Sequence, residues 1–371
     1  MVDEATGMKP GEAMPKTFVV LNGLRGVAAM AVAVMHLSYY TVPLHPAMVA
    51  PAVDFFFVLS GFVIAHAYGD RLAGGLGAGR FMLARLIRLY PLYLLGLLMG
   101  AAAMAAYQWL PESRFWSQFV FALLMLPGPM AFDRTNADLY PFNFPSWSLF
   151  FELLANLFYA LIAPRLSDRV LGFVIVIGFL SLVASGLATG TLDNGTVRPT
   201  FLGGLARVTF GFFAGVALHR RFRLRPSRLA LPPVVLVALL LLPLCFAPDH
   251  PAGWVYELVV VTIYLPGIVW LGAGASARGP SLRCCVVLGS LSYPLYVIHA
   301  PVWTMVRALD GKRLDGLLHL HAPWSGYLLV AVLCLAAWWL DRAVDHPARK
   351  RLSRALIRRS AHAANRDEGG A

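Results

Sequence analysis

The chain has 371 residues, of which 58% are hydrophobic and 13% are charged, and its formal net charge is +12. Soluble domains usually carry about 25% charged residues, so this composition excludes an ordinary water-soluble fold. The basic residues stand in short loops between apolar segments and form no groove or arm, which argues against a nucleic-acid partner.

Apolar stretches long enough to cross about 30 Å of hydrocarbon follow one another along the chain. They lie near residues 17–40, 49–69, 88–109, 146–164, 170–189, 200–219, 229–247, 253–273, 284–306 and 324–343. The first stretch lacks the cleavage site of a signal peptide and is expected to stay in the mature chain. We therefore predict an all-α polytopic membrane protein with about ten transmembrane helices. Its three parts are an N-terminal tail (1–16), a membrane domain (17–346) and a basic tail (347–371).

A shorter apolar segment, residues 115–130, decides the topology. If it does not cross, 23 Lys and Arg residues lie inside and six outside, whereas a crossing changes these numbers to 11 and 18. The positive-inside rule selects the first arrangement, with both termini in the cytoplasm and residues 115–130 as a re-entrant or interfacial segment. Arg outnumbers Lys by 27 to 4, which suggests a bacterial genome and hence the bacterial cytoplasmic membrane.

Ionisable side chains inside a membrane are costly and are therefore candidates for function. The first span holds Arg25 and His36, whose eleven-residue separation puts both side chains on one helix face about 16 Å apart. Small residues between them would let neighbouring helices approach that face. The alternative is that Arg25 reaches cytoplasmic headgroups and that His36 only bonds a neighbouring helix.

Three further ionisable residues are predicted at the depth of His36, in the outer half of the membrane. Asp54 follows the first loop by about five residues, Glu152 lies about 10 Å into the fourth span, and His299 lies about 24 Å along the ninth. Asp54 could accept one N–H of His36 and leave the other ring nitrogen as a base, or it could cap its own helix. We expect one polar cavity lined by the two histidines and the two carboxylates.

Three arginines, Arg80, Arg85 and Arg88, lead into the third span from the cytoplasmic side. Arg85 and Arg88 are three residues apart, face the same way and offer planar guanidinium groups to phosphates. Ordinary loops that obey the positive-inside rule look similar, so spacing alone leaves both explanations open.

Many of these residues belong to motifs that occur in the order typical of one family. The motifs are Arg25 to His36, the stretch FFVLSGF at 56–62, Arg85 and Arg88 before Tyr-Pro, the WSL and Glu motif at 147–152, and the SY-LY-H-P motif at 292–301. In these motifs, over residues 17–349, the chain resembles acyltransferase family 3. Enzymes of this family O-acylate bacterial surface polysaccharides, Nod factors and some macrolides.

The resemblance implies a set of site residues. The candidate catalytic residues are His36, Arg25, Glu152, His299 and Asp54, the acyl-CoA-binding residues are Arg85 and Arg88, and the motifs add Ser148 and Tyr293. Where the family often has Glu before Lys or Arg and Pro, this chain has Asp345, His346 and Pro347, which leaves the role of Asp345 open. The four cysteines show no metal-type spacing, and no metal is expected.

The activity that the resemblance implies is transfer of an acyl group, most often acetyl, from cytoplasmic acyl-CoA to a hydroxyl of a carbohydrate, glycolipid or similar acceptor. No tightly bound cofactor is expected. Arg85 and Arg88 would bind the CoA headgroup, and His36 would either deprotonate the acceptor or carry the acyl group transiently. The rival function is that of a lipid-linked sugar flippase or exporter, which predicts two related halves, although no internal repeat is visible.

Overall fold

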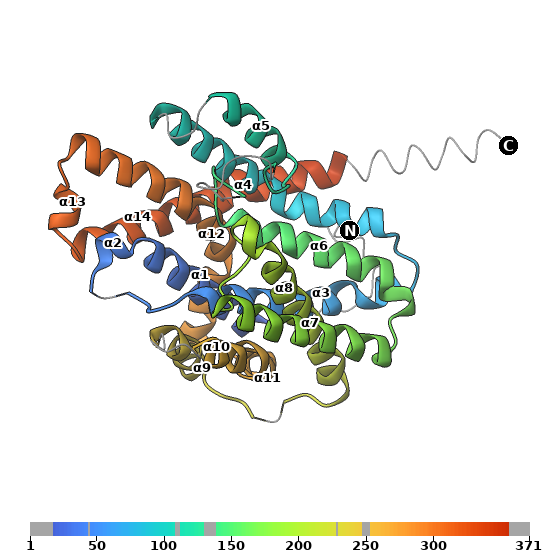
Figure 1. The fold of residues 1–371 in the computed structure, drawn as a ribbon. Coiled ribbons are helices and arrows are strands. Elements are labelled where there is room, and N and C mark those ends of the chain that lie inside the picture. The colour runs from blue at the N-terminus through green and yellow to red at the C-terminus, as the bar shows by residue number, and fades with distance from the viewer. Residues whose placement is uncertain are drawn as a thin grey trace.

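The computed structural model describes residues 18–43, 45–107, 112–129, 139–227, 229–246 and 253–355, and this part of the chain is helical without strands (Figure 1). The first half contains α1 (Val19–His36), α2 (Ser38–Thr41), α3 (Ala50–Ala73), α4 (Ala78–Tyr107), α5 (Glu112–Leu123), α6 (Ser146–Ile162) and α7 (Asp168–Thr189). The second half contains α8 (Phe201–Leu224), α9 (Pro233–Leu241), α10 (Gly253–Val259), α11 (Leu265–Gly274), α12 (Gly279–Arg313), α13 (Leu317–Leu320) and α14 (Trp324–Leu340). The predicted tail from residue 356 onward and residues 1–17 lie outside the described residues.

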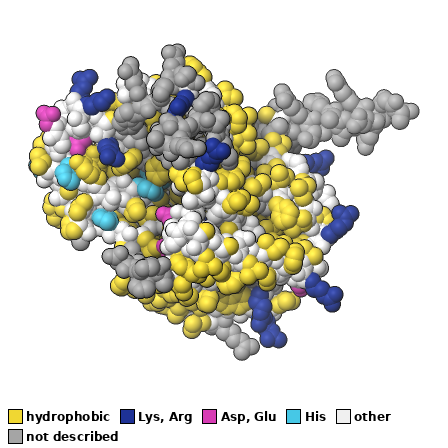
Figure 2. All heavy atoms as spheres, viewed as in Figure 1, with side chains coloured by type: hydrophobic (Ala, Val, Ile, Leu, Met, Phe, Trp, Pro, Cys, Tyr) yellow, Lys and Arg dark blue, Asp and Glu magenta, His cyan; other side chains and the backbone are white. Residues whose placement is uncertain are grey.

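The number of membrane spans agrees with the prediction of about ten. Among the described residues, nine helical segments are long and apolar enough to cross a membrane, and Pro233–Cys245 is a shorter apolar helix at the predicted seventh span. Figure 2 shows hydrophobic side chains over much of one face, with Lys and Arg gathered toward its edges. A surface of this kind is expected where lipid surrounds the protein.

Two pairs of long helices run parallel, although their members are far apart in sequence. Along α1 and α12, Arg25 contacts Ser292 and His36 meets His299, so both helices advance in the same direction. Along α3 and α8, residues 54, 66 and 70 contact partners that each lie 153 residues later. Parallel packing requires an odd number of crossings between the members of each pair. A crossing by the twelve-residue helix α5 would make both pairs antiparallel, so the structure agrees with ten crossings.

Glycines allow the members of each pair to approach closely. A Cβ atom added at Gly26 would collide with the carbonyl of Leu288 in α12, and one added at Gly61 would collide with the carbonyl of Phe212 in α8. Backbone contact of this kind is typical of small residues at helix interfaces in membranes.

Helices at the cytoplasmic side of the predicted topology are longer than the apolar pattern indicates. α4 begins at Ala78, so Arg85 and Arg88 lie within the helix and do not merely precede it. α14 continues through a π-helical turn, Asp341–Asp345, and remains helical to Ala355. Charged residues near these ends are therefore held on rigid helices, where they can contribute to a site.

Candidate functional site

A cavity of about 130 Å³ lies where α1, α3, α4, α6 and α12 converge. Its polar lining consists of Arg25, Ser60, Arg85, Arg88, Ser148, Glu152, Ser292, Tyr293 and Tyr296. Six of the predicted site residues are in this list, so the helices bring together side chains that span most of the sequence.

Two of the cavity arginines have partners on neighbouring helices. Arg25 donates from Nε to Ser292 Oγ at 2.9 Å and from Nη2 to the Gly289 carbonyl at 3.3 Å. Arg85 Nη2 donates to Glu152 Oε1 at 2.9 Å, and the same oxygen accepts a 2.7 Å hydrogen bond from Ser60. The Nε atom of Arg85 is buried and has no hydrogen-bond partner among the described residues. Arg85 is thus held in place by Glu152 at the cavity wall.

The third cavity arginine, Arg88, lies against the end of the chain's last helix. Its Nη1 is 3.3 Å from Asp345 Oδ2, and its guanidinium carbon is 5.2 Å from the ring centroid of Tyr293. Tyr293 in turn donates its hydroxyl to the Leu89 carbonyl, which fixes the ring. Asp345, whose role the sequence left open, is fully buried beside the cavity arginines.

Two hydroxyl groups connect the cavity to the histidines. Ser148 Oγ and Tyr296 Oη are 2.7 Å apart, and both residues line the cavity. The Tyr296 ring lies 5.7 Å from that of His299, one helical turn further along α12. The histidines are not among the lining residues, and Tyr296 is the lining residue that contacts the histidine pair.

The two histidines contact each other directly. His299 Nε2 lies 3.1 Å from His36 Nδ1, and the rings stack with centroids 5.1 Å apart. His299 Nδ1 lies 3.2 Å from the Leu295 carbonyl, which can only accept, so this nitrogen carries a proton. In the neutral pair, His299 Nε2 then accepts from His36 Nδ1–H, and Nε2 of His36 is unprotonated. This is the nitrogen that a general base requires.

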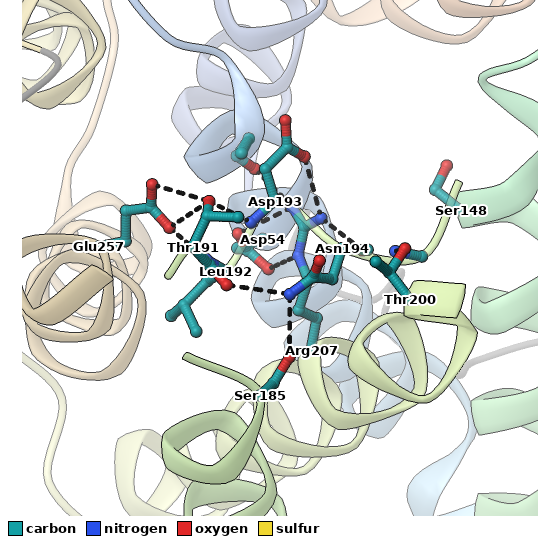
Figure 3. Close-up of polar contacts among 12 residues, drawn as sticks. Asp54, Ser148, Ser185, Thr191, Leu192, Asp193, Asn194, Thr200, Arg207 and Glu257 are labelled. Atoms are coloured by element: carbon teal, nitrogen blue, oxygen red, sulfur yellow. Dashed lines mark hydrogen bonds and ion pairs between the residues drawn. The ribbon is translucent and has the colours of Figure 1, made fainter. Parts of the chain in front are cut away.

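Asp54 has a different partner from the one that the sequence suggested (Figure 3). Its carboxylate accepts from Arg207 Nε at 2.9 Å and from Nη2 at 3.1 Å, and both residues are buried. Equal depth in the membrane does not fix the direction of a side chain, and Asp54 points toward α8 while His36 points toward α12. The predicted contact between Asp54 and His36 is therefore replaced by the contact between His36 and His299.

The remaining contacts of Arg207 anchor the loop before α8 (Figure 3). Arg207 donates to the Asn194 carbonyl and the Ala50 carbonyl, each at 2.9 Å, and lies 3.4 Å from Asp193 Oδ1. Arg207 belongs to none of the sequence motifs described above. A buried arginine near the outer end of its span, at the depth of Asp54, was the signal that could have suggested the pair.

The predicted layer of four ionisable groups is divided into three separate groups. The histidines pair with each other, Glu152 pairs with Arg85, and Asp54 pairs with Arg207. Within the described ranges, no three His, Cys, Asp or Glu side chains are grouped so that they could hold a metal ion. The guanidinium groups line the cavity, and the candidate base His36 lies beyond it. Such an arrangement suits transfer of a group from an anionic donor.

Comparison with known proteins places the chain in a family. The sequence model of an acyltransferase domain, that of acyltransferase family 3, matches residues 18–340. A protein of Rhizobium radiobacter described as "Protein 2 in picA locus" is 36% identical over 194 residues, which cover 46% of this chain and 95% of that protein. No solved structure matches the chain.

Proposed function

This chain belongs to acyltransferase family 3 and is a multi-pass membrane acyltransferase, and from that premise we propose that it transfers acetyl from cytoplasmic acetyl-CoA to a carbohydrate hydroxyl. One observation carries the proposal. Three arginines line one cavity with Ser148 and Tyr296, and the Tyr296 ring contacts His299, the partner of His36.

The arginine end of the cavity suits the donor. Guanidinium groups bind phosphates through paired, charge-assisted hydrogen bonds, and three arginines, Arg25, Arg85 and Arg88, line the cavity. A volume of about 130 Å³ accommodates several waters or the thioester end of an extended arm, but not a nucleotide. The nucleotide of acyl-CoA would remain at the mouth beside Arg88, while the pantetheine arm would extend inward.

The histidine end suits the acceptor. His36 Nε2 takes the hydroxyl proton as the acceptor oxygen attacks the thioester carbon. The C–S bond breaks as the new C–O ester bond forms, and the proton passes from His36 to the departing thiolate to give CoA thiol. Ser148 donates its proton to the Pro145 carbonyl, so the Tyr296 hydroxyl would be the neutral donor for the oxyanion on the thioester oxygen, in exchange for its contact with Ser148. Transient acylation of His36 is the alternative route, and an acyl-histidine trapped without acceptor would identify it.

The proposed orientation puts both termini in the cytoplasm of a bacterial cell and residues 190–199 outside the cytoplasmic membrane. This orientation rests on the positive-inside rule and on the parallel helix pairs. Cysteines introduced at residues 220–227 should react only after the membrane is permeabilised, whereas cysteines at 190–199 should react in intact cells. The opposite labelling pattern would mean that the donor end faces outward and the acceptor end faces the cytoplasm.

The proposed reaction is tested by measuring ester-linked acetate on cell-surface glycan with and without the protein, and by following labelled acetyl from acetyl-CoA in vesicles that contain the purified protein. We expect acetate on the glycan and CoA release that depend on the protein. A flippase or exporter would instead change the amount of surface glycan without changing its acetate content.

A further inference from the structure

Arg349, beyond the predicted membrane domain, lies next to the cavity arginine Arg88. Its Nη2 is 2.5 Å from Asp345 Oδ2, the same oxygen that lies 3.3 Å from Arg88 Nη1. Arg349 Nε also donates to the Asp345 carbonyl at 3.4 Å. One carboxylate oxygen thus bridges two guanidinium groups, and the side chain of Arg349 is still 24% exposed.

The bridging carboxylate is itself only partly satisfied. Asp345 is fully buried, and its Oδ1 has no hydrogen-bond partner among the described residues. A buried carboxylate requires compensation, so Asp345 holds both guanidinium groups firmly and orients them toward one point. A phosphate oxygen can also bind between two guanidinium groups in this way.

The local backbone explains how Arg349 reaches this place. The π-helical turn at Asp341–Asp345 ends at the bridging carboxylate, and the helix then continues with Arg349 one turn later. π-Helical turns occur frequently at functional sites because they redirect side chains from a regular helix face. The turn here is consistent with a helix end that has a binding role as well as a packing role.

The charge around the cavity favours an anion. The arginines are Arg25, Arg85, Arg88 and Arg349, and the paired carboxylates are Glu152, Asp341 and Asp345. Asp341 is the most distant partner, at 3.9 Å from Arg349. The cluster therefore retains positive charge beside a cavity, and an uncompensated charge at this depth is costly until an anionic ligand binds.

Resting on the proposed function, we propose that Arg349 is a further donor-binding residue: with Arg88 it binds the phosphate groups of acyl-CoA at the mouth of the cavity, and Asp345 is the positioning residue that holds the two guanidinium groups together. The cavity is too small for a nucleotide, so the phosphates must lie outside it, on the side where Arg349 is exposed. Arg88 belongs to both the cavity lining and this pair, and it connects the two parts of the donor site.

The test compares two donors with the purified protein in vesicles. One donor is acetyl-CoA, and the other is S-acetylpantetheine, which has the same thioester and arm but no phosphates. Arg349→Ala should raise the apparent KM for acetyl-CoA about tenfold, the loss expected for a charge-assisted hydrogen bond, and leave that for S-acetylpantetheine unchanged. Arg351→Ala, an exposed arginine two residues later, is the matched control and should change neither value.

A second variant excludes a simple folding defect. Arg349→Ala leaves a buried carboxylate with less compensation, whereas Arg349→Ala combined with Asp345→Ala removes both charges together. The double variant should insert normally and keep the selective loss for acetyl-CoA. An equal loss for both donors in the double variant would overturn the proposal and assign Arg349 to packing, and so would unchanged kinetics in Arg349→Ala.

A failure of the proposed function would give a different result from a failure of the role of Arg349. If the wild-type protein uses neither thioester, or uses both with the same KM, then acyl-CoA is not recognised through its phosphates and the donor assignment itself is wrong. If the wild type prefers acetyl-CoA and Arg349→Ala retains that preference, the donor assignment stands and only the role of Arg349 is excluded.

Discussion

Two groups of buried arginines differ in how completely their hydrogen bonds are satisfied. Arg207 has five N–H donors and five hydrogen bonds, two of them to Asp54 and two to backbone carbonyls. Arg85, in contrast, lines a cavity, and its buried Nε has no hydrogen-bond partner within the part of the chain that the structure describes. Both groups are membrane-embedded and arginine-rich, so residue type and depth do not distinguish them.

This difference in hydrogen bonding distinguishes a structural arginine from one that can bind a ligand. A fully satisfied guanidinium has no donor for a ligand, and its network fixes the helices and loop that it joins. A guanidinium that lines a cavity can bind an anion there. Complete hydrogen bonding thus assigns Arg207 to architecture, and the position of the other arginines in the cavity wall supports their proposed role in donor binding.

The largest expected effect on acyl transfer comes from replacing His36, the proposed base. His36→Ala should lower acyl transfer by about 100- to 10,000-fold, the usual contribution of a general base, while membrane insertion is unchanged. Transfer of labelled acetyl measures the first quantity and protease protection measures the second. His45→Ala, on an exposed histidine nearby, is the control. Near-normal turnover by His36→Ala would remove the base from the mechanism.

Loss of Arg207 should affect folding more than donor recognition. Arg207→Ala leaves Asp54 buried without its partner, and breaking a buried ion pair costs about 3–5 kcal/mol of stability. Thermal unfolding in detergent should show this loss. Replacing both residues, Asp54→Leu with Arg207→Leu, should recover much of it. Normal stability of Arg207→Ala with a raised KM for acetyl-CoA would place Arg207 in the donor site and break the comparison.

His299 should act through His36. His299→Leu removes the contact of His299 with His36 Nδ1 and leaves the Val32 carbonyl as the remaining partner of His36, so kcat should fall about tenfold, the loss expected for one hydrogen bond of about 1.5 kcal/mol. His299→Gln supplies an amide oxygen that can accept the same proton and should restore part of the rate. Because the variants differ in this hydrogen bond, equal rates for Leu and Gln would exclude a role in orienting the tautomer.

The sequence predicted the spans, but not which side chains meet. Hydropathy and charge counts depend on local sequence, and for that reason about ten spans and the non-crossing α5 could be predicted directly. The partners of Asp54 and His36 come from 153 and 263 residues away, on helices whose rotation is fixed only by packing. Arg349 was assigned to a basic tail because its neighbours are basic, although a π-helical turn directs it to Asp345.

The smallest expected effect concerns Arg85 and Arg88, for which the donor-binding role and the positive-inside rule make different demands. If the two residues only fix topology, lysine retains the required charge and should serve equally well. If they bind phosphates, the planar guanidinium matters and lysine is a poor replacement. A double variant, Arg85→Lys with Arg88→Lys, should insert normally and raise the apparent KM for acetyl-CoA about tenfold, because one or two charge-assisted bonds of roughly 1.5–3 kcal/mol each are weakened.

The kinetic measurement on that variant must separate the KM for the donor, acetyl-CoA, from the KM for the acceptor. Glu152 contacts Arg85 and Asp345 contacts Arg88, so lysine at either position also changes a contact with a carboxylate. Glu152→Gln is therefore the matched control, because it removes the charge of the partner and keeps both arginines. A donor-binding role predicts a rise in KM for acetyl-CoA in the lysine variant, with little change for the acceptor and a smaller rise in Glu152→Gln. If the KM for acetyl-CoA is unchanged in the lysine variant, Arg85 and Arg88 only fix the topology. The cavity arginines would then bind an anion other than acetyl-CoA.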